Sequence, residues 1–83
     1  MARTFVTDAD QSPVRFLTGQ RTQAFQAAVL VAGRLECEAE VVRRHDPEDD
    51  LPYLGIQLER TGPTFSDEEV RVAAELCALA REG

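Results

Sequence analysis

The sequence has no lysine or tryptophan, and it contains one histidine and two cysteines in 83 residues. A nucleophile needs a base within hydrogen-bond reach, and a structural zinc ion needs a cluster of cysteine and histidine. Cys37 and His45, eight residues apart in one extended segment, would be separated by roughly 26 Å. The sequence therefore predicts no catalytic residues, no metal site and no cofactor. Whether the protein is an enzyme stays open, with the balance against it.

Long apolar segments are also missing. The longest run, Ala27 to Gly33, is far shorter than the roughly 20 residues that cross a bilayer, and no secretory signal opens the chain. We therefore expect a cytoplasmic protein without membrane contact. Cys37 and Cys77 are then most simply reduced thiols of the core. Without a repeat or a linker, residues 1–83 read as one domain.

Basic residues are fewer than acidic ones. Fifteen acidic residues against nine arginines give a net charge of −6 and a pI near 4.6. Direct binding to nucleic acid or to an anionic membrane is disfavoured by this balance, since both carry negative charge. A protein partner with a basic surface is the easier match.

Two segments alternate between apolar and polar residues, as half-buried strands do. The first, from Leu35 to Val41, has glutamate at every even position, and the second runs from Tyr53 to Arg60. If Arg44 pairs with Tyr53, Leu54, Ile56 and Leu58 share one face with Ala39 and Val41. The two segments then form an antiparallel pair with one apolar and one acidic face. A register shifted by two residues is the alternative, and it keeps the same faces.

The acidic face is our leading candidate for a functional surface. It would carry Glu36, Glu38, Glu40 and Glu59, with Tyr53 and Gln57 beside them. A solvated sheet face is the plainer interpretation. As a function, the pattern suggests a regulatory protein-interaction module that docks a basic partner or pairs with itself as a homodimer. Inhibition by mimicry of a nucleic-acid backbone is one form of this hypothesis.

The two segments are joined by a loop from His45 to Asp50. It lacks the acid and glycine spacing of a calcium loop, so we expect a solvated connection. Arg43 and Arg44 precede it and are candidates for contacting a phosphate or carboxylate. The alternative is that they neutralise the nearby acids from Glu48 to Asp50.

The remaining segments predict a hairpin and two helices. Residues 3–7 and 14–17 favour strands around a turn. A helix capped by Thr18 or Thr22 would bury Phe25, Ala28, Val29 and Ala32 and end at Gly33. The competing possibility is one long bent strand from Val29 to Val41.

The last helix has the clearest start. Ser66 to Glu69 forms a capping box, Phe65 and Val70 form a hydrophobic staple, and the helix should run from Asp67 to about Arg81. The order ββαββα predicts an α+β open-faced sandwich with two helices on one face of a four-stranded antiparallel sheet. It matches a permuted ferredoxin-like fold, with a β-grasp-like arrangement as the alternative.

Tyr53 to Ala80 combines the strand Leu54-Gly55-Ile56-Gln57-Leu58-Glu59-Arg60 with Phe65-Ser66-Asp67-Glu68-Glu69 and an apolar helix. This third of the chain resembles the closing strand and helix of GAF sensory domains, which are much longer and have another element order. The resemblance implies a small-ligand sensor as an alternative function. Its pocket would lie between sheet and helices near Phe16, Phe25 and Phe65.

Overall fold

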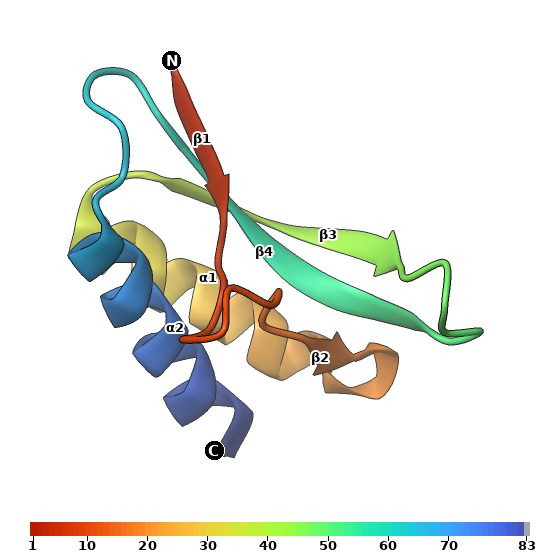
Figure 1. Ribbon diagram of the computed structural model, residues 1–83. Helices are drawn as coiled ribbons and strands as arrows, with labels where there is room; N and C mark the ends of the chain where they lie inside the picture. The colour runs from red at the N-terminus through yellow and green to blue at the C-terminus, as the bar shows by residue number, and fades with distance from the viewer. Residues whose placement is uncertain (83) are drawn as a thin grey trace.

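The computed structural model describes residues 1–82 and has the expected order of elements (Figure 1). A short 3-10 turn, η1, precedes the first helix. The elements are β1 (Ala2–Phe5), β2 (Phe16–Leu17), η1 (Thr18–Gln20), α1 (Arg21–Leu35), β3 (Glu38–His45), β4 (Pro52–Arg60) and α2 (Asp67–Glu82). The α+β class and the four-stranded antiparallel sheet with two helices are confirmed.

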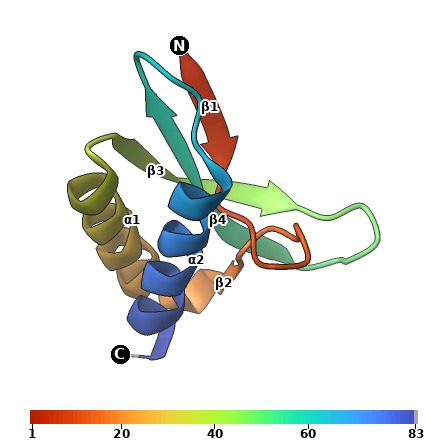
Figure 2. The same cartoon turned by 60° about the vertical axis from the view of Figure 1, so that its left-hand side comes forward.

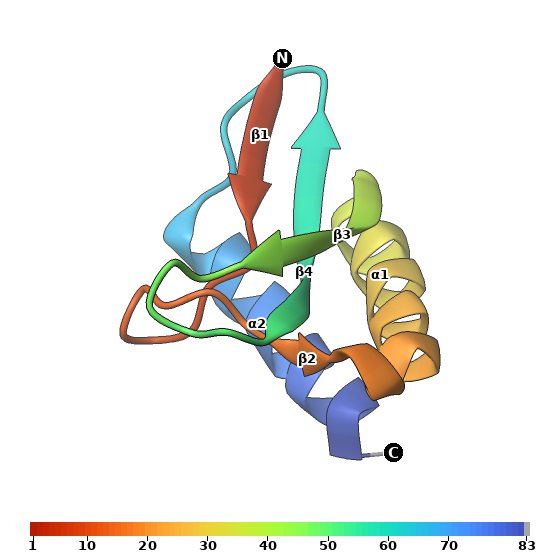
Figure 3. The same ribbon diagram turned by 90° about the vertical axis from the view of Figure 1, so that its right-hand side faces the viewer.

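Strand β4 is the centre of the sheet. One of its edges pairs with β3 in the predicted register, with Arg44 opposite Tyr53, Val41 opposite Ile56 and Glu38 opposite Glu59. Its other edge is shared, because β1 pairs with the second half of β4 and β2 with the first half. In Figure 3, β1 and β2 follow one another along this edge.

The predicted N-terminal hairpin is present as a short connection. The Val14 N–H donates to the Val6 carbonyl at 3.0 Å, and Thr7 bridges Pro13. The Asp8 carboxylate closes the turn by accepting backbone N–H groups. Beyond this contact the two strands separate, and each takes its ladder partner from β4.

Both helices lie on the same side of the sheet (Figure 2). They run antiparallel to each other, and the core fills the space between them and the strands. The fully buried side chains with the largest volumes are Phe16, Ile56, Leu58, Val6, Val31 and Cys77. Apart from Ala2 and Tyr53, the buried hydrophobic residues of the described chain form one cluster, which is the core of an open-faced two-layer sandwich.

Helix α1 differs from its prediction in its buried face. Ala24, Ala27, Ala28 and Val31 are buried, whereas Phe25 and Val29 are 49% and 72% exposed. Small alanine side chains let the helix approach the sheet and α2 closely, and Val31 joins them in the core. Of the predicted row, Ala28 is buried and Ala32 half-buried as expected, whereas Phe25 and Val29 lie outside the core.

The ends of α1 also differ from the prediction. Neither Thr18 nor Thr22 caps it, because η1 comes first and the Gln20 side chain accepts the Leu17 N–H at 2.9 Å. The helix continues through Gly33 to Leu35 and ends at Glu36, which has a left-handed φ of 52°. The long-strand alternative is therefore wrong, and β3 begins only at Glu38.

Helix α2 begins as its sequence predicts. The Glu69 N–H donates to the Ser66 hydroxyl at 3.1 Å, and the Ser66 N–H donates to the Glu69 carboxylate at 3.0 Å. Ala73, Cys77 and Ala80 face the core, while Leu79 is 64% exposed. Neither helix within residues 1–82 combines the length and the apolar character that crossing a membrane would require.

Candidate interaction surface

The sheet face opposite the helices is uncovered (Figure 3), and the strand registers place its residues in cross-strand rows. The first row holds Glu38, Glu59 and Arg3, and the second holds Glu40, Gln57 and Phe5. The next two rows hold Val42 with Gly55 and then Arg44 with Tyr53. The face therefore changes from acidic at one end to basic and aromatic at the other.

The acidic end contains two shallow hollows. Glu36, Glu38 and Glu59 line one of them together with Met1 and Arg60. Glu38, Glu40, Gln57 and Glu59 line the other. Although Glu36 lies at the helix–strand junction instead of in β3, it still joins the glutamates of the sheet. The structure thus brings together all four glutamates and Gln57 of the predicted surface.

Arginine offsets part of this negative charge. Arg3 contacts Glu59 through Nε at 3.1 Å and Nη2 at 3.0 Å. This pair also relieves the opposition of Glu38 and Glu59, since like charges in directly opposite positions repel. Within residues 1–82, Glu36, Glu38 and Glu40 make no ion pair.

Arg60 borders the acidic end, but its charge is used elsewhere. Its guanidinium binds both carboxylate oxygens of Glu69, at 2.6 and 2.9 Å, and stacks over the Phe65 ring at 4.2 Å. It also donates to the carbonyls of Pro63 and Thr64. The Arg60 pair, followed by the Ser66 N–H, lowers the pKa of Glu69 to about 2. Arg60 therefore fastens the link between β4 and α2 and makes no ion pair with the glutamates of the acidic end.

Tyr53 belongs to the other end of the face. Arg15 covers its ring at 4.3 Å and binds Asp46 at 2.8 Å, so Tyr53 is buried. The Glu48 N–H and then Arg15 lower the pKa of Asp46. Six residues of strand separate Tyr53 from Glu59, about 20 Å. The structure does not bring Tyr53 to the predicted acidic surface.

Arg43 and Arg44 are exposed at the far end of β3. Arg44 lies over the Phe5 ring at 4.3 Å, and that ring in turn covers Gly55. Within the described residues, neither arginine makes an ion pair. The acidic loop is bound by Arg15 instead, through Asp46 and more distantly Asp49, so Arg43 and Arg44 do not neutralise it as the alternative expected.

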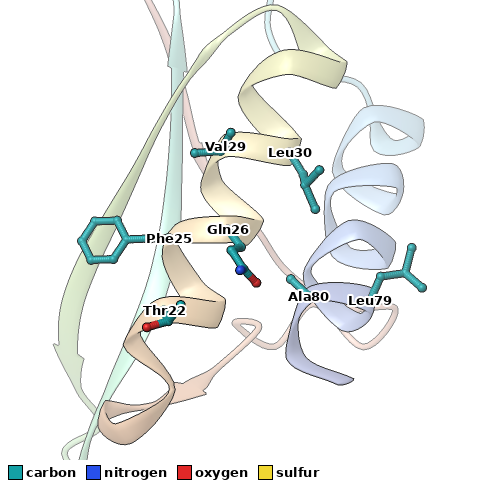
Figure 4. A pocket seen from close by; sticks show the side chains of 7 residues that line it. All are labelled: Thr22, Phe25, Gln26, Val29, Leu30, Leu79 and Ala80. Carbon is teal, nitrogen blue, oxygen red and sulfur yellow. The ribbon is translucent and has the colours of Figure 1, made fainter. Parts of the chain in front are cut away.

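The three phenylalanines of the sensor hypothesis lie in different places. Phe16 is fully buried, Phe65 lies under Arg60, and Phe25 is on the outer surface of α1. Instead, the helices form an apolar groove of about 710 Å³ (Figure 4). Its lining residues are Thr22, Phe25, Gln26, Val29 and Leu30 of α1, with Leu79 and Ala80 of α2. In Figure 4, Phe25 points away from α2 and Leu30 points toward it.

The titratable groups of the described chain form no other site. No group of three or more His, Cys, Asp or Glu residues within 1–82 is arranged to hold a metal ion. Both cysteines are free thiols. Burial raises the pKa of Cys37, and it raises the pKa of Cys77 to about 11, so both thiols are held in the protonated form.

Sequence reasoning missed three side chains of the open face. Arg3, Phe5 and Arg15 come from the N-terminal segment and neutralise or cover residues of β3 and β4. Alternate residues of a strand share a face, which puts Arg3 and Phe5 on one side of β1, but only the pairing of β1 with β4 shows which residues they meet. No local signal in the sequence specifies that pairing.

Comparison with models of known protein families finds no match, and no curated protein or solved structure matches significantly. The fold and the surface together define a two-layer α+β domain with a charged, uncovered sheet face. Its function is therefore argued from this surface.

Proposed function

We propose that this protein is a protein-interaction module that binds a basic protein surface through the acidic end of its sheet. The acidic end consists of Glu36, Glu38, Glu40 and Glu59. The observation that carries the proposal is that these four carboxylates share two adjoining hollows and only Arg3 pairs with any of them in the described chain. Such a field steers a cationic partner and discriminates against anionic ones.

A fluorescent nona-arginine peptide is a direct probe of this site. The test variant combines Glu36→Arg, Glu38→Arg and Glu40→Arg. The matched control combines Asp10→Arg, Glu75→Arg and Glu82→Arg, which reverses three exposed acids elsewhere and gives the same net charge. We expect the test variant to lose about tenfold or more in affinity and the control to lose much less.

Fluorescence anisotropy at rising salt gives the second readout. Affinity should fall steeply as salt screens the exposed charges over a Debye length of about 8–10 Å. Equal losses in the test variant and the control would show that net charge alone attracts the peptide, and would overturn the proposal. If the partner uses its basic surface to bind nucleic acid, binding of this protein to that surface would inhibit the partner. Competition between this protein and DNA for the partner tests this inhibitory role.

As a second candidate we propose binding of a small apolar ligand in the groove between α1 and α2. Its support is the uncharged lining and a volume within the usual range for ligand sites. Thermal unfolding in the presence of a metabolite library tests it: a ligand should raise the midpoint in the wild type and not in Leu30→Arg. A library without any effect would remove this candidate.

A further inference from the structure

Strand β3 has a free edge. It pairs with β4 on one side, and within residues 1–82 its other side receives no backbone hydrogen bond (Figure 3). The opposite edge of the sheet is divided between β1 and β2, which have only four and two residues. An eight-residue edge without proline or a bulge is a template for pairing with another strand.

The charges of β3 are ordered along the strand. Glu38 and Glu40 occupy its first half, Val41 and Val42 its centre, and Arg43 and Arg44 its second half. Reversing the direction of such a strand exchanges its acidic and basic halves. In an antiparallel pair of two β3 strands, the basic half of each strand therefore lies beside the acidic half of the other. An edge strand without this charge order would not be complementary to β3 in this way.

We infer that the partner of the acidic end is a second copy of this chain, bound by antiparallel pairing of β3 with β3. The inference rests on the proposed function, because it assigns a basic partner residue to the acidic end through Glu38. A two-fold axis perpendicular to the sheet joins the two sheets edge to edge. The interface is isologous, so every contact occurs twice.

The charges also select a register. With the axis at Val41, Glu38 lies opposite Arg44 of the second copy and Glu40 lies opposite Val42, all on the open face. With the axis at Val42, Glu40 gains Arg44 but Glu38 meets Asp46. The first register avoids an acid–acid contact and is the one that cross-strand pairing favours.

Exposed apolar side chains of α1 lie beside β3 and would extend the interface beyond the strand edge. Phe25 and Val29 of α1 line a hollow together with Ala39, Glu40 and Val41 of β3. Figure 4 shows Phe25 directed to this side, away from α2. Joining two copies along β3 brings this exposed apolar flank toward its symmetry mate. Backbone pairing is thereby supplemented by burial of apolar side chains, which stable dimers require.

Sedimentation equilibrium between about 1 and 200 µM protein tests the inference. Wild type should form a dimer. Each favourable cross-strand charge pair contributes a factor of about 1.5 to 5 in affinity. Glu38→Arg with Glu40→Arg, or Arg43→Glu with Arg44→Glu, should therefore weaken the dimer about tenfold or more. Combining all four substitutions should restore it, and mixing the two double variants should give a heterodimer.

Two further substitutions distinguish this interface from the groove between the helices. Val29→Arg should weaken the dimer. Leu79→Arg, at an apolar position of α2 that is 64% exposed against 72% for Val29, should leave it intact. Circular dichroism of each variant separates loss of pairing from loss of fold. A monomeric wild type, or a dimer broken by Leu79→Arg and unaffected by the charge reversals, overturns the inference. A monomer that still binds nona-arginine through Glu38 and Glu40 would overturn it and retain the proposed function.

Discussion

Gly55 provides a test of how the open face is packed. It lies in β4 beneath the Phe5 ring, and an added Cβ would be 3.5 Å from Phe5 Cε1 and 3.9 Å from Arg44 Cγ. These are ordinary van der Waals distances, so alanine fits without displacement. Glycine within a strand costs about 0.5–1 kcal/mol relative to alanine. We expect Gly55→Ala to stabilise the fold by about that amount.

Gly55→Val should have the opposite effect. Its γ carbons extend about 1.5 Å beyond Cβ, which is incompatible with a ring atom already at 3.5 Å. The ring and the Arg44 side chain stacked on it at 4.3 Å must move away. Overpacking of this kind costs about 1–3 kcal/mol.

Urea unfolding followed by circular dichroism measures both variants, and thermal unfolding supports it with shifts of about 4–8 °C per kcal/mol. In a Phe5→Ala background the cost of valine should largely disappear, because the obstructing ring is gone. Gly33→Ala is the control: it lies in α1 with no atom within 4 Å of the added Cβ. Its effect should be the same in both backgrounds. If Gly55→Val were as stable as Gly55→Ala, the ring could not lie over Gly55.

Three other substitutions test single features of the fold. Glu69 has its pKa lowered to about 2, so its contribution is complete above the unfolded value near 4.3 and is lost as pH falls through the folded value. Glu69→Gln should be less stable than wild type in urea at neutral pH, and the difference should narrow steadily as pH falls from about 4 to about 2. Burial raises the pKa of Cys77 from 9.0 to about 11, so wild type should lose stability between these pH values, and Cys77→Ala should lack that slope in urea titrations. Glu36 has φ of 52°, where glycine is unstrained, so Glu36→Gly should raise the free energy of unfolding by about 0.5–1 kcal/mol, measured the same way.

The parts of the fold that could be predicted are those with a local signal. Alternation predicted the faces of β3 and β4, but a shift by two residues keeps the same faces, so it limited the register only to one parity. The register assumed by pairing Arg44 with Tyr53, in which Val41 meets Ile56, is the one that the strands adopt. The start of α2 could be predicted because the side chains of Ser66 and Glu69 each accept a hydrogen bond from the other residue's backbone N–H, within four residues of sequence. In both cases the signal lies in residues that are close in sequence or that follow one repeating pattern of apolar and polar side chains.

Features that depend on distant contacts were missed. The α1 sequence contains apolar residues on more than one side, and packing against the sheet selected its alanines and Val31 for burial in place of Phe25. Tyr53 was assigned to the acidic surface because odd-numbered residues of β4 share one face. The alternation pattern does not show which side chains lie next to it on that face. Its neighbour is Arg15, from a segment 38 positions earlier, which covers the ring.

The junction from Leu35 to Cys37 shows how one error left the site intact. Alternation continues through these residues, so they read as the start of a strand, but the Cys37 N–H instead donates to the Ala32 carbonyl at 3.2 Å and closes the helix. Glu36 takes the left-handed conformation that this closure needs, and it lies outside β3. It nevertheless reaches the hollow that Glu38 and Glu59 line, because the turn lies at the same end of the sheet. The acidic end is therefore built from a helix terminus as well as from strands, and Glu36, lying before β3 begins, remains outside the strand pairing that would occupy Glu38 in a dimer.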